Sequence, residues 1–303
     1  MMDYREFVEE FVMAIEEETG LKAEFHEGNE KMPKDSIYVY LSESKNSTNI
    51  LRLYTKESYG EWKNKKRTFC SLVKEAKQSV ENFENMRVPD KMRQMEEYDR
   101  VKGNLFIRLI NAEKNEEELK YAIYKQVGDI ALTLYMMLAE EDGMITSCKV
   151  PLRYIDKWNM KKEKIFDAAL RNTALMMPPR WYDFIKMLFI PEYEGEDIYD
   201  PDYAINKEIL GNCLSTNRKT NGAVAIFYPG VAKYICQEMG TEGLYLVFTS
   251  IHEVMVHNVK KLEVEDLKRT LKGTMEEATP EDDVLTNYVY HYDLHTDQIE
   301  MVL

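Results

Sequence analysis

The sequence is poor in the patterns that mark the most easily recognised binding sites and membrane anchors. Its 13 glycines form neither G-x-G-x-x-G nor G-x-x-x-x-G-K-[ST], so a loop that cradles nucleotide phosphates is disfavoured. The longest apolar stretch, near Ile130–Ala139, is about half of the roughly 20 residues that a helix needs to cross a bilayer. We therefore expect no nucleotide-binding loop and no membrane span.

Cysteine is scarce as well, and the four cysteines show no C-x-x-C spacing: Cys70, Cys148, Cys213 and Cys236. The first 20 residues are acidic and lack the basic region followed by an apolar region that a secretory signal has. Scattered cysteines without such a signal favour a reduced, cytoplasmic compartment.

Basic residues are outnumbered by acidic ones, 40 to 54, which gives a formal net charge of −14. Charge of that sign repels a polyanion, so direct binding to nucleic acid is disfavoured. A local basic cluster beside Trp62 could override the mean, and it consists of Lys63, Lys65, Lys66 and Arg67. We prefer to interpret this cluster as the solvated face at the start of a helix.

The hydrophobic fraction, 44% of 303 residues, allows either one large core or two smaller ones. Residues 1–88 are predicted to form a small α-β-β-β-α unit. Its first helix carries an apolar stripe of Phe7, Val8, Phe11, Val12 and Ile15, and it ends at Gly20. The strands are expected at Lys22–His26, Ser36–Leu41 and Asn49–Tyr54, and the second helix at Lys63–Asn85.

Residues 103–303 are predicted to form a larger mixed α/β domain. Val88–Lys102 is interpreted as a linker or connecting helix, with a single compact domain as the alternative. A hairpin is expected from Ile130–Ala139 to Met144–Val150 around Asp142-Gly143. Helices are expected at Asn159–Asn172 and from Trp181 to Phe189 after Pro178-Pro179, followed by an exposed acidic, tyrosine-rich loop at Glu192–Tyr203.

The last third is predicted to contain a β-α-β unit. Ala223–Tyr228 is interpreted as a buried strand, Val231–Met239 as a helix that starts after Pro229 and ends at Gly240, and Leu244–Thr249 as the second strand. Further along the chain we expect a strand at His252–Val256, a helix at Leu262–Met275, and strands at Asn287–Tyr292 and Gln298–Val302.

Polar residues follow the predicted strands of this last third, where ligands bind in open α/β sheets. The candidate ligand or interaction site comprises Asn217, Asn221, Tyr228, Ser250, His252 and Glu253. The alternative is that several of these residues only shape turns, for which asparagine, glycine and serine are favoured.

Familiar catalytic patterns do not fit these residues. His252-Glu253 begins like H-E-x-x-H, but Val256 stands where the second histidine is required. The histidines His252, His257, His291 and His295 could converge in space, yet ordinary strand histidines are the preferred interpretation, and we expect no metal and no cofactor. Ser250 or Ser215 could join His252 in hydrolase chemistry, but no G-x-S-x-G elbow occurs, so no catalytic residue is assigned.

Several segments together resemble a known family. They are Leu109–Asn115, Asp129–Leu138, Trp158-Asn159, Ala168–Thr173, Asn221–Ala223, Tyr228–Gly230, Ser250–Val254, Asp283–Leu285 and Tyr288–Asp293. The chain resembles the bacterial domain-of-unknown-function family numbered 5688 over nearly its whole length and, more distantly, the family numbered 1444. The resemblance implies a soluble intracellular bacterial protein of unassigned activity, and it carries no catalytic residues over to this chain.

Two classes of function stay open at this point. The leading hypothesis is a non-catalytic cytoplasmic protein that binds or regulates a protein partner, and one version of it is an acidic inhibitor that occupies a partner's nucleic-acid groove. The alternative is a small-ligand-binding protein or a hydrolase-type enzyme with its site near Ser250, His252 and Glu253. The sequence leaves the oligomeric state open.

Overall fold

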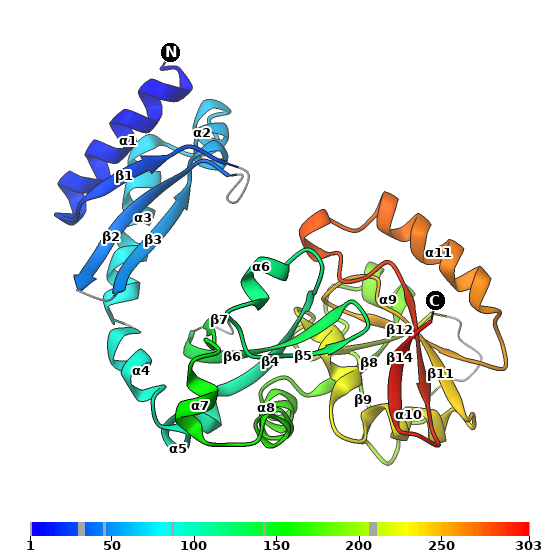
Figure 1. Ribbon diagram of the computed structural model, residues 1–303. Helices are drawn as coiled ribbons and strands as arrows, with labels where there is room; N and C mark the ends of the chain where they lie inside the picture. Colours follow the sequence, from blue (N-terminus) through cyan, green and yellow to red (C-terminus); the bar gives the residue numbers. More distant parts are fainter. Residues whose placement is uncertain are drawn as a thin grey trace. The chain divides into compact units, whose positions relative to one another are not determined.

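The computed structural model describes residues 2–29, 34–44, 47–85, 88–141, 144–205 and 211–302. Its contacts divide the chain into two compact units, Met1–Asp90 and Lys91–Leu303. Helices and antiparallel sheets occur in both units, so the predicted mixed α+β class is confirmed (Figure 1). Within the described residues, no helix combines the length and the apolar character that crossing a membrane requires.

The first unit is an antiparallel sheet of three strands in the order β1-β2-β3. Its elements are α1 (Tyr4–Thr19), β1 (Ala23–His26), β2 (Ser36–Ser44), β3 (Ser47–Tyr54), α2 (Thr55–Lys63) and α3 (Phe69–Asn85). Helix α1 starts with a capping box between Asp3 and Glu6, and Gly20 ends it in the left-handed conformation. The helix, three strands and helix that the sequence predicts are present, with α2 as an additional short helix.

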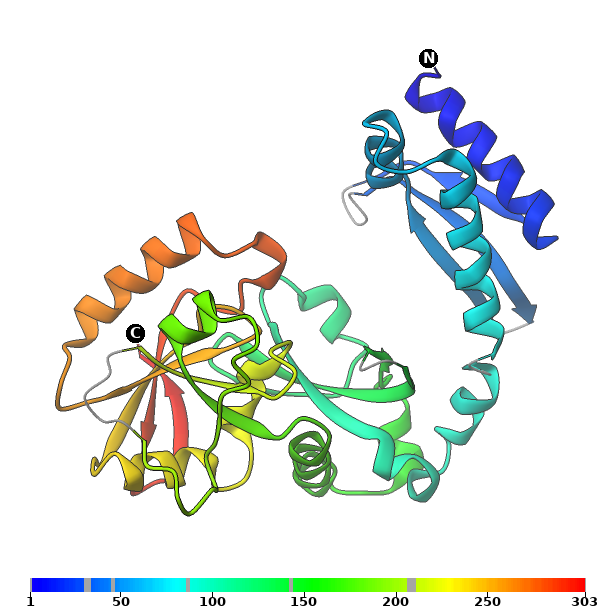
Figure 2. The same cartoon turned by 180° about the vertical axis from the view of Figure 1, so that it is seen from behind.

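Helices α1 and α3 lie on the same face of this sheet (Figure 2). Apolar side chains from both helices and from the strands form one core, including Phe7, Phe11, Ile37, Val39 and Leu72. One detail of the prediction is wrong, because the basic cluster is not on a single helix from Lys63. Helix α2 ends at Lys63 and α3 begins at Phe69, so the cluster lies in the turn between them.

The second unit contains two antiparallel sheets. The smaller sheet has the order β4-β6-β5, with β7 also paired to β6, and the larger has the order β14-β13-β11-β12-β10-β8-β9. The strands are β4 (Leu105–Asn111), β5 (Tyr124–Val127), β6 (Ile130–Glu141), β7 (Met144–Lys149), β8 (Pro179–Asp183), β9 (Glu196–Asp197), β10 (Asn212–Thr216), β11 (Gly243–Val247), β12 (Val254–Asn258), β13 (Val289–Asp293) and β14 (Gln298–Met301).

Helices of varied length accompany these sheets. They are α4 (Val88–Gln94), α5 (Tyr98–Val101), α6 (Glu116–Leu119), α7 (Tyr154–Trp158), α8 (Lys162–Met176), α9 (Phe184–Phe189), α10 (Val231–Glu238) and α11 (Val264–Glu277), with 3-10 turns η1 (Lys102–Asn104), η2 (Gly222–Phe227) and η3 (Glu281–Asp283). Helix α11 packs on β11 and β13 through Leu267 and Leu271, and α8 lies along β4. The segment predicted as a linker or connecting helix thus contains two short helices, α4 and α5.

A buried polar group joins the two sheets of the second unit. The Tyr290 hydroxyl on β13 donates hydrogen bonds at 2.6 Å to Asp129 Oδ1 and at 3.1 Å to the Val127 carbonyl. The Thr286 hydroxyl donates to the same Asp129 oxygen at 2.7 Å. Because these polar atoms are buried, their mutual bonds fix how the smaller sheet meets the larger one.

The predicted β-α-β unit begins at a different strand from the one expected. Ala223–Tyr228 is not a strand, because Gly222–Phe227 forms the 3-10 turn η2. A fully buried apolar run has no solvent face, so periodicity cannot distinguish a strand from a helical turn. Strands β10 and β11 both pair antiparallel to β12 and therefore run in the same direction, joined by η2 and α10. The unit exists with β10 as its first strand.

Other predicted elements are confirmed or shifted. The hairpin of β6 and β7 is confirmed, while its expected turn at Asp142-Gly143 lies outside the described residues. Trp181 is not helical but lies on β8, and α9 starts only after Asp183, whose carboxylate caps it. Strand β12 starts at Val254, so His252 and Glu253 precede it instead of lying within it.

Candidate functional site

His252 is the centre of the polar group that the structure forms near η2. Its Nδ1 accepts a hydrogen bond from the backbone N–H of Asn221 at 3.0 Å, and its Nε2 lies 3.4 Å from Asp283 Oδ1. Because Nδ1 accepts, the neutral ring carries its proton on Nε2, facing the carboxylate. The imidazole thereby bridges the start of η2 and the end of η3.

His252 is held beside η2 because its own segment, β10 and Gly222 approach one another closely. The Ser215 hydroxyl on β10 donates to the backbone carbonyl of His252 at 2.7 Å. Gly222 lies against both, since a Cβ there would be 2.1 Å from Ser215 Oγ and 2.6 Å from the His252 carbonyl oxygen. Glycine is therefore required at position 222 for steric reasons.

The hydroxyl of Ser250 makes its hydrogen bonds within the turn before β12. It accepts the His252 N–H at 2.8 Å and donates to Glu253 Oε1 at 2.8 Å, and Thr249 donates to the same oxygen at 2.6 Å. Neither Ser250 nor Ser215 hydrogen-bonds to the imidazole of His252. Both hydroxyls instead bond to backbone or carboxylate groups of the turn, Ser215 to the His252 carbonyl and Ser250 to Glu253.

Two of the expected site residues lie apart from this group. Tyr228 is 3% exposed and its hydroxyl donates to the Met177 carbonyl at 3.1 Å, so it is a core residue, and burial raises its pKa. Asn217 is exposed and its backbone N–H donates to the Pro178 carbonyl. The structure thus brings together Asn221, Ser250, His252 and Glu253, and leaves out Asn217 and Tyr228.

Sequence reasoning missed Asp283 and Gly222 as members of this group. Asp283 is far from His252 along the chain, and an aspartate in an acidic run carries no signal of its partner. The left-handed backbone of Asn221, with φ of 52°, could have been suspected from the Asn-Gly pair, which is typical of turns. Among the described residues, no group of three or more His, Cys, Asp or Glu side chains could hold a metal ion.

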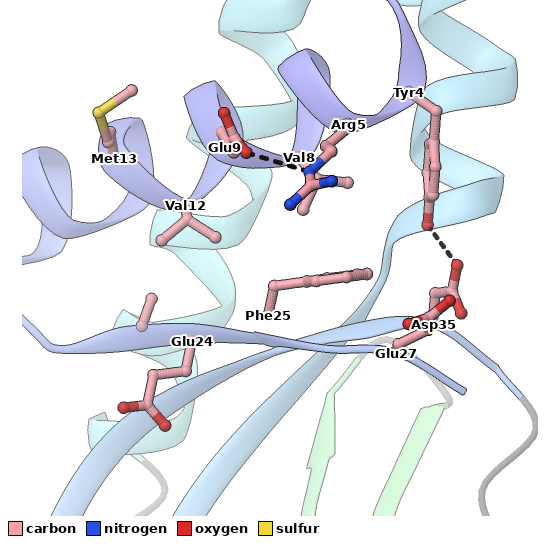
Figure 3. Close-up of a pocket in the computed structure, with 11 residues that line it drawn as sticks. Tyr4, Arg5, Val8, Glu9, Val12, Met13, Glu24, Phe25, Glu27 and Asp35 are labelled. Atoms are coloured by element: carbon pink, nitrogen blue, oxygen red, sulfur yellow. Dashed lines mark hydrogen bonds and ion pairs between the residues drawn. The ribbon is translucent and has the colours of Figure 1, made fainter. Parts of the chain in front are cut away.

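A larger depression lies in the first unit, between α1 and the edge strand β1. This α1–β1 groove has a volume of about 1000 Å³ and is lined by Tyr4, Arg5, Val8, Glu9, Val12, Met13, Ala23, Glu24, Phe25, Glu27 and Asp35. Phe25 lies beneath Arg5 and Val8, and Glu24 turns away from the helix (Figure 3). Phe25 is 40% exposed and Met13 is 59% exposed, so the groove presents two large apolar side chains to solvent.

Hydrogen bonds close one end of the α1–β1 groove. The Tyr4 hydroxyl donates to Asp35 Oδ2 at 2.8 Å and lies 2.6 Å from the hydroxyl of Thr55. The Gly28 N–H donates to Asp35 at 2.8 Å and lowers the pKa of that carboxyl, while burial raises the pKa of Tyr4 to about 12. The carboxylate and the phenol therefore keep complementary protonation states at neutral pH.

The open edge of β1 runs along the groove. Ala23 pairs with Val39 and Phe25 with Ile37, and the Tyr40 N–H donates to the Lys22 carbonyl. Since hydrogen-bonded pairs alternate in an antiparallel ladder, the backbone groups of Ala23 and Phe25 face away from β2. Glu16 accepts the N–H of Ala23, whereas the register leaves the N–H and C=O of Phe25 at the open edge.

The architecture is that of a mixed α+β protein with a small sheet unit followed by a larger two-sheet unit. The chain belongs to the Family of unknown function (DUF5688), whose sequence model matches residues 4–294. The predicted family is therefore confirmed. Comparison with curated proteins and with solved structures finds no match.

Proposed function

We propose that this protein is a non-catalytic interaction module whose α1–β1 groove binds an extended, basic segment of a partner protein. The observation that carries the proposal is the exposed Phe25 on an edge strand beside an apolar groove, with backbone groups that bond to none of the described residues. Edge strands of this kind accept an added strand, in which backbone hydrogen bonds supply affinity and alternate side chains supply specificity.

The apolar lining supports a partner segment with apolar side chains at alternate positions. Val8 and Val12 of α1 face Phe25 of β1 across the groove. Complete burial of a phenylalanine or leucine side chain contributes about 1.5 to 3 kcal/mol, which is enough for one side chain to determine whether a short peptide binds.

The charge of the groove supports lysine or arginine at the intervening positions. The lining carries four carboxylates, those of Glu9, Glu24, Glu27 and Asp35, and one cation, Arg5, which is already paired with Glu9 at 3.5 Å. Among the described residues, Glu27 at the end of the groove makes no ion pair, so its carboxylate is available to a partner's cation. An acidic segment would be repelled by the same side chains.

The pairing of the acidic residues favours this proposal over an acidic inhibitor that occupies a partner's nucleic-acid groove. A mimic of a phosphate backbone needs a row of unpaired carboxylates. Here Asp35 is bonded to Tyr4 and Gly28 and lies 3.3 Å from Lys56, and Glu18 is paired with Lys77. The four cysteines are free thiols, which supports our further proposal that the protein acts in the reducing cytoplasm.

Selection from a random peptide display library on the immobilised full chain tests the proposal. We expect the enriched peptides to be positively charged, with apolar residues at alternate positions. Phe25→Ser should weaken their binding about tenfold or more, since a tenfold change is about 1.4 kcal/mol. Ile50→Ser removes a side chain of similar exposure, 39%, from β3 outside the groove and should leave binding unchanged.

The same selection can overturn the proposal. Acidic peptides, peptides without the alternation, or equal binding to the Phe25→Ser and wild-type proteins would each contradict it. Peptides N-methylated at the amides that face β1 should bind more weakly than peptides methylated at the amides facing away, because only the first set bonds to Phe25. Equal binding of the two methylated sets would exclude strand addition.

A further inference from the structure

Arg108 in the second unit is a cation without an anionic partner in the described part of the chain. It lies on β4 opposite Thr133 of β6, and its side chain is half-buried. Its guanidinium carbon lies 5.3 Å from the ring centroid of Phe106 and 5.1 Å from that of Tyr135. Among the described residues, no carboxylate lies within 4 Å of this guanidinium and no group hydrogen-bonds to it.

Holding the Arg108 guanidinium in this place lowers the stability of the protein when no ligand is bound. Partial burial removes water from the guanidinium, and this loss lowers the pKa of Arg108. Contacts with two aromatic rings recover part of this cost, but the rings supply no oxygen acceptor for the N–H donors of the planar fork. A half-buried cation that no protein group pairs with or accepts a hydrogen bond from is well placed to be completed by an anionic ligand.

Arg108 lines a cleft of about 360 Å³. Polar groups in its wall include Lys114, Asn115, Tyr135 and Asn221, and apolar side chains include Leu109, Ile110, Ile251 and Val284. The Asn221 side chain makes no hydrogen bond to the described residues, so its amide can also serve a ligand. The volume is at the lower end of the range for small-molecule sites, and the mixed lining is typical of them.

The charges around the cleft favour one particular kind of anion. Arg108 and Lys114 are the cations of the wall, and the exposed Glu281 and Asp282 are its carboxylates. The formal charges therefore cancel, which disfavours a polyphosphate. A single oxyanion can instead accept two parallel bonds from the planar guanidinium while its apolar part lies against the aromatic and aliphatic side chains.

We propose that this cleft, here named the Arg108 cleft, binds a small organic monocarboxylate whose oxygens pair with the Arg108 guanidinium. The site is distinct from the α1–β1 groove and belongs to the other unit. Asn221 also lines the cleft and contributes its amide, and the hydrogen bond from its N–H to His252 holds this residue in place. Ser250 and Glu253 stabilise the turn that carries His252.

Two measurements on the full chain test whether the Arg108 cleft binds a carboxylate: titration calorimetry and thermal unfolding. Each is made with benzoate, acetate, phosphate and sulfate at constant ionic strength. Benzoate is expected to bind saturably and to raise the unfolding midpoint, because a ligand that binds only the folded state stabilises it. Absence of saturable binding by both carboxylates would overturn the proposal. Stabilisation by phosphate or sulfate with none by benzoate would overturn the assignment to a carboxylate.

Three variants separate ligand binding from a structural role. Arg108→Met should abolish benzoate binding and leave the unliganded unfolding midpoint equal or higher, because an apolar side chain of similar volume replaces an unpaired buried charge. Arg108→Lys keeps the charge without the planar fork and should bind about tenfold more weakly. Arg153→Met removes an exposed arginine that also contacts an aromatic ring, at 5.1 Å from Tyr154, and should bind benzoate as the wild type does.

The outcome for Arg108→Met decides between the two roles. A destabilised Arg108→Met protein that still binds benzoate would show that the guanidinium is structural, and the proposal would be wrong. Failure of this site would leave the α1–β1 groove untouched, because no residue is shared between the two.

Discussion

The backbone N–H of Asn221 donates a hydrogen bond to the imidazole Nδ1 of His252 across 3.0 Å. The other ring nitrogen lies 3.4 Å from Asp283, the last residue of η3. Asn221 and Asp282, the neighbour of Asp283, both line the Arg108 cleft. His252 is therefore a positioning residue that connects two lining segments of the cleft.

Replacement of His252 tests this role. His252→Ala should lower the free energy of unfolding by about 1 to 3 kcal/mol, because the Asn221 N–H loses its acceptor and Asp283 its partner. It should also weaken benzoate binding, since Asn221 is no longer held. Urea unfolding and calorimetry measure the two effects, with His295→Ala at an exposed position as the control. If His252→Ala changed neither quantity, the positioning role would be refuted.

Two glycine substitutions should have opposite effects on the free energy of unfolding. Gly222→Ala places a methyl group 2.1 Å from Ser215 Oγ and 2.8 Å from the Thr216 backbone nitrogen, so it should destabilise the protein by several kcal/mol, on the order of other overpacked core sites. Gly273 lies inside α11, and a methyl group added there would meet nothing within 4 Å. Gly273→Ala should therefore stabilise by about 0.5 to 1 kcal/mol. Chemical denaturation of both variants checks the pair, and equal effects would contradict the packing at Gly222.

His257 is expected to make stability dependent on pH. Burial lowers its pKa from 6.5 to about 4, so the folded protein binds this proton more weakly than the unfolded chain. The neutral ring contributes its full stability above pH 6.5, and that contribution of roughly 2 to 3 kcal/mol is lost as the pH falls from 6.5 through about 4.

Carboxylates titrate in the same pH range, so the contribution of His257 to the free energy of unfolding is found by comparing variants with the wild type. Urea unfolding at about pH 7.5 and about pH 4.5 should show a smaller loss for His257→Gln than for the wild type. His295→Gln, at an exposed position, should keep the wild-type loss. An identical loss in all three proteins would mean that His257 is not buried as described.

The bond between Tyr290 and Asp129 should contribute measurably to the junction of the two sheets. Tyr290→Phe removes the one hydroxyl proton that Asp129 Oδ1 and the Val127 carbonyl share, as well as the acceptor of the Asp129 N–H, and Thr286 is then the remaining hydroxyl that donates to this buried carboxylate. We expect a loss of about 2 to 3 kcal/mol in the free energy of unfolding. Tyr234→Phe is the control, because no hydrogen bond of its hydroxyl occurs within the described part of the chain. A loss no greater than that of the control would contradict the proposed junction.

The sequence predicts best the elements whose apolar residues have a clear solvent-facing side. The stripe of Phe7, Phe11 and Ile15 with Gly20 behind it identifies α1 almost to the residue. The buried run at Gly222–Phe227 has no such side, and only the contacts of Gly222 with β10 explain why it is a 3-10 turn.

The same reasoning explains which site residues could be found. The turn chemistry of Asn221, Ser250 and Glu253 is local and is visible in the sequence. The pairing of His252 with Asp283, and the absence of a carboxylate near Arg108 among the described residues, are produced by tertiary packing and leave no local pattern. The α1–β1 groove was likewise missed, because the exposure of Phe25 depends on how far α1 covers the sheet.

Amide hydrogen exchange at Phe25, with and without a peptide selected on the full chain, tests the proposed function most directly. Strand addition gives the Phe25 N–H an acceptor that it lacks at the open edge of β1. We expect exchange of this amide to slow about tenfold or more in the complex, while the Phe25 N–H of the free protein exchanges rapidly. Unchanged exchange at Phe25 in a saturated complex would contradict strand addition.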